Sequence, residues 1–277
     1  MKFPLCLAGT GRTVAVLLLS SPVWAWAADP TPAATVTMLT GRGTATADTT
    51  IRPLAKGDAV FSGEIVSSAN NSFINLKFTD GGYVLLRPAS RFHVEQFVDH
   101  ASKPAAPPPP PPAPPPKTAA THTPAVAPVP LAAPTPAPSA AFFRLLKGGF
   151  RAVSGLVGRF NHEEYQVATP VATIGIRGTD YEAVICDAAC AMDPVISSSL
   201  PPGKTAEGGL ITGVFHGRIE VGDLSQCPED STQKSKACVE LSEGQYNLTT
   251  ADGSQVSLPS QPHFLNVDPI PNPRMCE

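Results

Sequence analysis

A proline-rich block divides this sequence into two parts. Between residues 103 and 139 the composition shifts to Pro and Ala, with unbroken proline from 107 to 112 and Pro at near-alternate positions up to 138. Proline lacks the backbone N–H that helices and sheets require, and such a segment has little apolar surface to bury. We expect residues 103–139 to be a disordered, extended spacer that could span on the order of 100 Å. It is either an inert linker or a docking site or strut, and its composition favours the linker.

The first 28 residues have the pattern of a secretory signal peptide. Lys2 and Arg12 are the only charges before Asp29, residues 14–19 form a short apolar core, and residues 25–27 offer a small-x-small cleavage pattern. That core is too short for a membrane helix, and no later stretch reaches the ~18 apolar residues that a span needs. We expect an exported protein, periplasmic or else secreted or surface-associated, with no membrane span after cleavage.

The charge balance argues against nucleic acid as a partner. Loss of the two basic leader residues lowers the formal net charge from −3 to −5, and the remaining charges form no long block of one sign. A nucleic-acid-binding protein needs a basic surface to neutralise phosphates. We therefore expect no nucleic-acid partner.

The two parts that flank the spacer, residues 34–100 and 140–258, have the pattern of β-structure. In residues 73–78, Ile74, Leu76 and Phe78 alternate with other side chains, and a turn at residues 80–82 leads into a second apolar run at 83–86. A period of two is typical of half-buried strands. Residues 91–95 alternate in the same way, and no window outside the leader shows a helical period over ten or more residues. Similar short runs follow after the spacer, at residues 142–146, 149–153, 164–168, 171–176, 179–186, 210–215, 218–221, 245–249 and 255–258. The sequence predicts an all-β fold, followed by a tail at residues 259–277.

Residues 167–184 are the most distinctive stretch. Two β-type runs flank Arg177-Gly178-Thr179-Asp180, a step at which the chain can bend sharply because glycine tolerates conformations that other residues resist. The stretch supplies no nucleophile with a base, no metal cluster and no phosphate-binding loop. It predicts two strands joined by a tight bend.

This stretch resembles the signature of the FecR domain, a periplasmic module named after the ferric-citrate transport regulator. Other segments resemble that family's pattern in the same order: the "Gly-Asp … Gly-x-Ile" opening, a hydrophobic strand with an Asp-Gly turn, the signature itself and the closing strands, at residues 53–65, 73–82, 165–179, and 210–221 with 241–245. The resemblance covers both flanks, so we expect them to fold as one domain with the spacer as an excursion. Loop-closure costs rise only slowly with length, which makes such an insertion tolerable.

The resemblance implies a β-solenoid-like or β-roll stack of short strands. Founding members of the family also carry a cytoplasmic segment that handles a sigma factor and a transmembrane helix, and neither is found in this sequence. For this sequence the resemblance therefore implies an exported, non-enzymatic module that binds an envelope protein in signalling or assembly. The alternative is a cell-wall protein that binds peptidoglycan or another glycan.

The signature residues have a structural and a functional interpretation. In the first, Thr169 and Pro170 set the start of a strand, Gly175 and Gly178 permit close chain approach, and Arg177 pairs with a carboxylate or with backbone carbonyls. In the second, Arg177 and Asp180 present a charged site for a ligand or partner beside the bend. The structural interpretation is favoured for the signature as a whole, Thr179 included, and it predicts that Arg177→Ala lowers the stability of the fold.

Cysteine usage agrees with export. Cys186, Cys190, Cys227 and Cys238 form a group whose members can pair in three ways, and sequence does not choose between them. Local pairs are the simplest arrangement, whereas crossed pairs would join the region after Cys186 to the later loop. A zinc site is the rival interpretation, but the spacing fits a zinc ribbon poorly. Cys276 is left over, either free or intermolecular.

Candidate catalytic groups are few. The histidines form no metal-binding spacing, no Gly-x-Ser-x-Gly motif is present, and the cluster at residues 162–164 fits a solvated turn. Asp80 is better explained as a hairpin residue than as a catalytic carboxylate. We therefore expect no catalytic residue, no cofactor and no metal.

Overall fold

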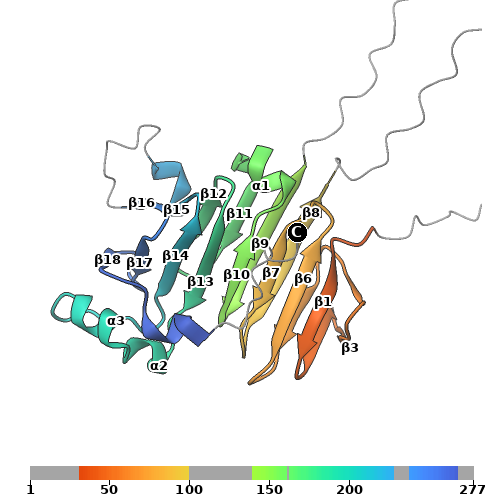
Figure 1. The fold of residues 1–277 in the computed structure, drawn as a ribbon, viewed down its shortest axis with the longest axis horizontal. Coiled ribbons are helices and arrows are strands. Elements are labelled where there is room, and N and C mark those ends of the chain that lie inside the picture. Colours follow the sequence, from red (N-terminus) through yellow and green to blue (C-terminus); the bar gives the residue numbers. More distant parts are fainter. Residues whose placement is uncertain (1–30, 100–138, 161, 228–236, 268–277) are drawn as a thin grey trace, which may run out of the picture. The chain divides into compact units, whose positions relative to one another are not determined.

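The computed structural model describes residues 31–99, 139–160, 162–227 and 237–267. The described residues belong to one structural unit, Thr31–Glu277, whose secondary structure is almost entirely β-strand (Figure 1). The predicted all-β class is therefore confirmed. The leader, almost all of the proline-rich spacer and the end of the tail lie outside the described residues.

The strands form two nine-stranded sheets, which we call sheet A and sheet B. In spatial order, sheet A contains β18 (Gln255–Leu258), β17 (Tyr246–Thr249), β14 (Leu210–His216), β13 (Asp180–Ile185), β10 (Gly149–Val153), β7 (Tyr83–Leu86), β6 (Phe73–Phe78), β1 (Ala34–Thr40) and β4 (Ala59–Val60). Sheet B contains β16 (Cys238–Ser242), β15 (Arg218–Gly222), β12 (Thr173–Ile176), β11 (Tyr165–Ala168), β9 (Ala140–Lys147), β8 (Arg91–Val98), β5 (Ile65–Ser68), β2 (Gly43–Ala47) and β3 (Thr50–Pro53).

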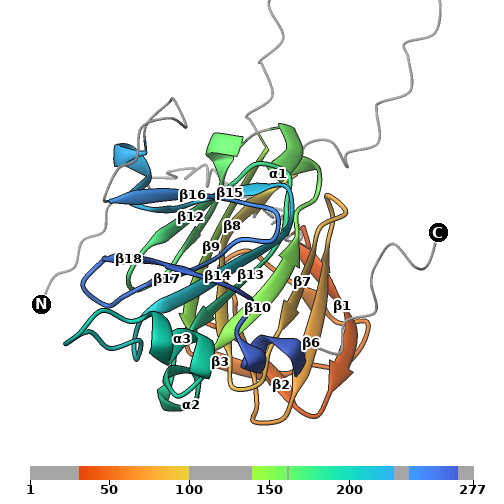
Figure 2. The ribbon, with the colours of Figure 1, turned by 60° about the vertical axis from the view of Figure 1, so that its left-hand side comes forward.

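The chain builds both sheets progressively from one end to the other. From β6 onward it adds one or two strands to a sheet and then crosses to the other sheet, so the C-terminal strands β16 and β18 lie at the same end of the two sheets (Figures 1 and 2). All neighbouring strands run antiparallel except β9 and β11, which are parallel. The expected solenoid or roll is not detected in the described residues, because neither sheet is closed.

The core lies between the two sheets, where the alternating apolar side chains of each strand meet. Seven aromatic rings form a continuous chain of contacts across it, with centroids 5.0–6.3 Å apart: Phe78, Phe92, Phe97, Phe143, Phe150, Tyr165 and Tyr181. Such tilted and edge-to-face pairs add to the free energy gained from burial alone. Because Phe78 and Phe150 belong to sheet A and Phe92 and Phe143 to sheet B, these contacts join the sheets.

The proline-rich spacer connects two strands that pair with each other. β8 ends just before it and β9 begins just after it, and the register aligns Val98 with Ala140. The residues that flank the spacer, Val98 and Ala140, are therefore held side by side in sheet B. In each sheet the strands of the first flank lie beside those of the second, meeting at β7 and β10 in sheet A and at β8 and β9 in sheet B, so the flanks share one core.

A smaller apolar cluster covers the outer face of sheet A near its C-terminal end. Two short helices, α2 (Ala188–Ala191) and α3 (Pro194–Ser199), and the 3-10 helix η3 (His263–Val267) pack there with Val184, Ile211 and Leu248. Asp187 and Asp193 cap the two helices, accepting hydrogen bonds from Cys190 N and Val195 N at 2.9 Å each. The remaining helices are α1 (Leu156–Phe160), η1 (His162–Glu164) and η2 (Leu224–Gln226).

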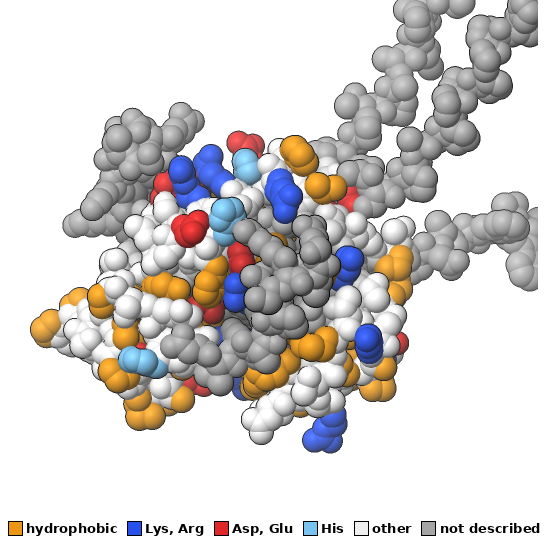
Figure 3. Space-filling view, viewed as in Figure 1, with side chains coloured by type: hydrophobic (Ala, Val, Ile, Leu, Met, Phe, Trp, Pro, Cys, Tyr) orange, Lys and Arg blue, Asp and Glu red, His pale blue; other side chains and the backbone are white. Residues whose placement is uncertain are grey.

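Charged side chains of both signs are interspersed on the molecular face drawn in Figure 3. On sheet B, basic and acidic groups pair across neighbouring strands, as in Arg144 with Glu95 and Arg218 with Glu240. These pairs intersperse basic and acidic side chains on sheet B.

Candidate functional site

The signature stretch forms a crossing between the two sheets. Residues 167–184 include the second half of β11, all of β12 and most of β13, and the short link at residues 177–179 carries the chain from sheet B to sheet A. The predicted pair of strands joined by a bend is present. The bend does not make a hairpin, because its two strands belong to different sheets.

Gly178 makes the corner of this crossing. Its φ of +67° lies in the left-handed region that favours glycine, and its N–H donates to Gly158 O at 3.0 Å. Thr179 N donates to Ser154 Oγ at 2.8 Å, while Thr179 O accepts from Ser154 N at 2.9 Å. These bonds fix the corner to the segment that follows β10.

A second crossing packs directly on the first. The chain returns from β14 to β15 through Gly217, whose φ is +83°. A Cβ placed on Gly217 would lie 2.5 Å from Gly178 O and 2.9 Å from Thr179 Cγ2. The close approach of these two corners therefore requires glycine at Gly217.

Thr169 organises the turn between β11 and β12. Its Oγ1 donates to Ala172 O at 2.7 Å and accepts from Ala172 N at 3.1 Å, and Pro170 lies within the turn that these bonds close. On β12, Gly175 lies against Leu224 of η2, with 3.3 Å between a Cβ built on Gly175 and Leu224 Cδ1. Both positions have local structural roles.

Arg177 and Asp180 have different partners. Arg177 donates to Glu220 Oε1 at 2.9 Å across β12 and β15, and its side chain is 52% exposed. Asp180 accepts from Arg151 Nε and Nη2 at 2.9 Å each, and the Arg151 guanidinium also lies 3.9 Å from the centre of the Phe215 ring. The two signature charges thus take part in separate ion pairs, one in each sheet.

The four clustered cysteines form two local disulfides. Cys186 at the end of β13 pairs with Cys190 of α2, and Cys227 after η2 pairs with Cys238 at the start of β16, with Cα–Cα distances of 5.3 and 5.1 Å. The crossed pairings and the zinc interpretation are therefore not adopted. Among the residues described, no group of three or more His, Cys, Asp or Glu side chains could hold a metal ion. Cys276 lies outside them.

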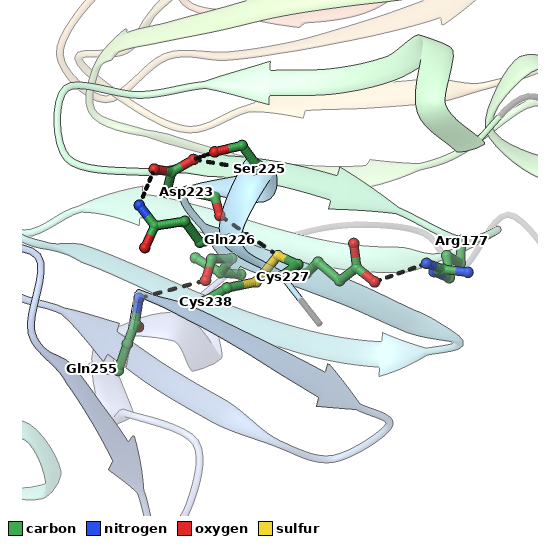
Figure 4. The surroundings of a disulfide bond; sticks show 9 residues. Arg177, Asp223, Ser225, Gln226, Cys227, Cys238 and Gln255 are labelled. Carbon is green, nitrogen blue, oxygen red and sulfur yellow. Dashed lines mark hydrogen bonds and ion pairs between the residues drawn. A yellow bond between two sulfur atoms is a disulfide. The ribbon is translucent and has the colours of Figure 1, made fainter. Parts of the chain in front are cut away.

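The second disulfide borders a large cleft at the C-terminal end of the two sheets (Figure 4). The cleft has a volume of about 1150 Å³ and extends from β15 and β16 in sheet B to β17 and β18 in sheet A. Its lining includes many polar side chains: Glu220, Asp223, Glu240, Ser242, Gln245, Asn247, Thr249, Asp252, Ser254, Gln255 and Ser257. The apolar residues Val171, Val239 and Leu241 complete one side.

Buried amides and hydroxyls form one wall of this cleft. Asn247 and Thr249 are each 1% exposed and face inward from β17, where a sheet core normally carries apolar residues. Gln255 Oε1 accepts from Asn247 Nδ2 at 2.7 Å and from Thr249 Oγ1 at 2.8 Å, and Gln255 Nε2 donates to Val221 O at 3.5 Å. The last bond links the two sheets across the cleft (Figure 4).

Most of the carboxylates that line the cleft are compensated by other groups. Glu220 pairs with Arg177, Glu240 with Arg218, and Asp252 with Lys204, whose ammonium lowers the pKa of the Asp252 carboxyl. Asp223 accepts from Ser225 and Gln226, and these hydrogen bonds lower the pKa of its carboxyl (Figure 4). The cleft therefore combines a nearly balanced charge with a high density of hydrogen-bonding groups.

Two acid–base candidates from the sequence hold the backbone in place. Asp80 is 4% exposed and accepts from Gly82 N at 3.0 Å and Val157 N at 3.2 Å; burial raises the pKa of its carboxyl. His162 Nδ1 lies 2.9 Å from Gly158 O. Asp80 thus has the hairpin role expected for it and also caps α1.

The cleft is the part of the molecule that sequence reasoning missed. Part of its polar wall comes from residues 245–249. The sequence predicts a strand there, but it did not show which of the strand's side chains face the interior. The available signal was Asn247 and Thr249 at alternate positions of this short strand. Polar residues on the inner face of a strand indicate either a hydrogen-bond partner in the core or a nearby cleft.

Comparisons with known proteins add little. No family model matches the sequence, and no curated protein matches it. Two crystal structures of a protein from Parabacteroides distasonis, titled "putative anti-sigma factor", are similar at 10% sequence identity, with TM-scores of 0.36 and 0.37. The match covers 71% of this chain and 59% of each of those chains, so this chain spans less than two thirds of their length.

Within the described ranges, every helix is too short or too polar to cross a bilayer.

Proposed function

We propose that this protein is an exported, non-enzymatic module of the bacterial envelope that binds a protein partner, as its resemblance to the FecR domain implies. The observation that carries the proposal is the open cleft between the terminal strands β16 and β18. The rest of the interior is filled by apolar and aromatic side chains, whereas this end presents hydrogen-bonding groups around an unfilled space. We take the cleft as the partner-binding site.

The compartment in the proposal is supported by the two disulfides. Disulfides form and persist in oxidising environments such as the periplasm and the cell surface. The leader pattern at residues 1–28 predicts the same route. In that setting the module would act in signalling or in envelope assembly.

Binding of peptidoglycan or another glycan is the second candidate. The amides and hydroxyls of the cleft could bind the hydroxyl groups of a saccharide as well as a polypeptide. However, the described lining residues include no aromatic ring on which the apolar face of a sugar could pack. This difference favours the protein partner.

Site-specific cross-linking in the periplasm tests the proposal. A photo-reactive amino acid would replace Ser257, an exposed residue of the cleft, and in a control Ile51, which is 68% exposed on β3 at the far edge of sheet B. We expect a discrete cross-linked protein from position 257 and not from position 51. The captured protein, once purified, should bind the wild type and should bind Ser257→Arg about tenfold more weakly, because the larger side chain fills the cleft.

A sedimentation assay with purified peptidoglycan separates the two candidates. Co-sedimentation of the wild type that is lost in Ser257→Arg, together with no cross-linked protein at position 257, would replace the proposal with the glycan alternative. Equal cross-linking from positions 257 and 51 would show that the cleft is not the binding site.

A further inference from the structure

Among the described strands, none pairs with the outer edge of β16, which lies beside the cleft. β16 ends sheet B among the described strands, with β15 on one side only. Asp223 N donates to Ala237 O at 2.9 Å, so Ala237 directs its backbone groups toward β15. Backbone N–H and C=O groups point to opposite sides at successive residues of a strand. The backbone groups of Val239 and Leu241 therefore also point toward β15, whereas those of Cys238, Glu240 and Ser242 point toward the outer edge.

The far end of this edge is already closed. Ser242 N donates to Gln245 Oε1 at 2.7 Å, and Ser242 O accepts from Gln245 N at 3.0 Å. These bonds agree with the alternation and occupy the last outward-facing position of β16. Cys238 and Glu240 are then the two positions whose backbone groups are directed toward an incoming strand.

The strand is held in a fixed position before any partner arrives. The Cys227–Cys238 disulfide attaches its first residue to the segment after η2 (Figure 4). Arg218 lies 3.5 Å from Glu240 and holds the middle of the strand. A rigid edge lowers the entropic cost of binding an extended segment. β18 also borders the cleft, but no disulfide attaches it to the fold.

The size and charge of the cleft fit a polypeptide segment. Its volume of about 1150 Å³ exceeds the range of roughly 300–1,000 Å³ that is usual for small-molecule pockets. Glu220 and Glu240 are paired with arginines, so a strongly charged ligand of either sign is not favoured. The lining of amides and hydroxyls matches the donors and acceptors of an extended backbone with polar, uncharged side chains.

We propose that an extended, largely uncharged segment of the partner protein adds a strand to sheet B by pairing with Cys238 and Glu240 of β16. This mode of recognition supplies affinity through main-chain hydrogen bonds and selectivity through the pockets that receive alternate side chains. The inference rests on the function proposed above and specifies how the partner is held.

Proline scanning of the two edges tests this inference. The probe is a synthetic linear peptide selected from a phage-displayed library against the purified protein with its disulfides intact. Glu240→Pro removes an edge-facing N–H, a change that edge strands tolerate, and should weaken peptide binding about tenfold or more. Glu240→Ala keeps the backbone donor and should bind within about threefold of the wild type. Ile51→Pro places the same change on β3, at the far edge of sheet B and outside the cleft, and should have little effect.

Amide hydrogen exchange provides a second measurement on the wild type, in case Glu240→Pro does not fold. We expect the Glu240 and Cys238 amides to become protected when the peptide binds. Unchanged exchange at both amides, or equal binding by Glu240→Pro and wild type, would overturn the inference. Failure to select any peptide, with binding of soluble peptidoglycan fragments in the cleft instead, would also overturn it.

The two proposals can fail separately. A partner captured at position 257 that still binds Glu240→Pro normally would reject strand addition to β16 and leave the protein-binding function in place. The absence of any captured protein at position 257 would reject the function itself.

Discussion

Glu220 and Glu240 lie directly opposite each other on β15 and β16, and each is held by its own arginine. Like charges at opposed positions of a sheet destabilise the pairing of strands. Arg177 donates to Glu220 at 2.9 Å and Arg218 lies 3.5 Å from Glu240, so the arginines offset this repulsion. The signature arginine therefore supports the attachment of the last strand of sheet B.

Arg177→Ala should lower the free energy of unfolding by about 0.5–1 kcal/mol, since the ion pair is half-exposed and such pairs contribute little. Part of this loss of stability comes from repulsion between Glu220 and Glu240, because Glu220 no longer has a cationic partner. Adding Glu220→Gln should recover most of the loss, because it removes one of the opposed charges. Urea denaturation of the single and double variants measures both effects. An unchanged single variant would favour a binding role for Arg177, and a double variant no better than the single would refute the repulsion argument.

Arg151→Ala should be more damaging than Arg177→Ala, with a loss of about 2–3 kcal/mol. Arg151 makes two hydrogen bonds to Asp180 and packs on the Phe215 ring, and its side chain is only 24% exposed. Denaturant unfolding of the two arginine variants under the same conditions provides the comparison. Equal losses of stability in the two variants would show that the second Arg151–Asp180 hydrogen bond and the contact with the Phe215 ring do not contribute to stability.

Gly217→Ala should be strongly destabilising, by about 2–4 kcal/mol, because its Cβ would meet Gly178 O at 2.5 Å in addition to the backbone strain. Gly203 provides the matched control, since its φ of +78° is similar and no atom lies near its Cβ position. Gly203→Ala should cost only about 1–2 kcal/mol. Thermal unfolding of both variants separates the steric contribution from the conformational one, and similar losses would contradict close packing of the two crossings.

Removal of the Cys227–Cys238 disulfide should cost about 3 kcal/mol and removal of Cys186–Cys190 about 2 kcal/mol in the chain-entropy model. The first bond closes the longer loop, with a sequence separation of 11 against 4. Paired Cys→Ser variants, each compared with the wild type by denaturant unfolding, test this order. Peptide mapping under non-reducing conditions should recover both local pairs, and a crossed pair would contradict the structure.

Stability should fall at alkaline pH because of two core phenols. Tyr165 and Tyr181 are 4% and 0% exposed, and burial raises the pKa of both above the usual value of 10. The unfolded chain therefore ionises first, so the stabilisation is complete below pH 10 and is lost as the pH rises above it. Each phenol can contribute a slope of up to about 1.4 kcal/mol per pH unit.

The double variant Tyr165→Phe/Tyr181→Phe should show a flatter decline between pH 10 and 11 than the wild type. Tyr83→Phe, at a half-buried position on β7, is the control and should keep the wild-type slope. Equal slopes in the double variant and the wild type would assign the alkaline loss to other groups.

Much of the secondary structure could be predicted because alternation is a local property. The pattern at residues 73–78 and 83–86 gave strands that match β6 and β7, and the runs after the spacer correspond to β9–β15, β17 and β18. Strands with weak alternation were missed. β2 carries small residues such as Gly43 and Ala45, and in β16 only Val239 and Leu241 form the apolar face, which is too short a pattern to identify a strand. The short helices were also missed, since α2 and α3 are too brief for a helical period, although Asp187 and Asp193 are good caps.

The sequence alone determined the all-β class, the position of most strands and the tight bend at Arg177–Asp180, because these follow from side-chain period and backbone freedom over a few residues. Only the tertiary structure decided which cysteines pair, that the bend crosses between sheets, and that Arg177 and Asp180 belong to separate ion pairs. It also decided that Asn247 and Thr249 line an open cleft. Each of these depends on which strands become neighbours across long sequence separations, and that choice is made by packing and register in the whole fold rather than by local pattern.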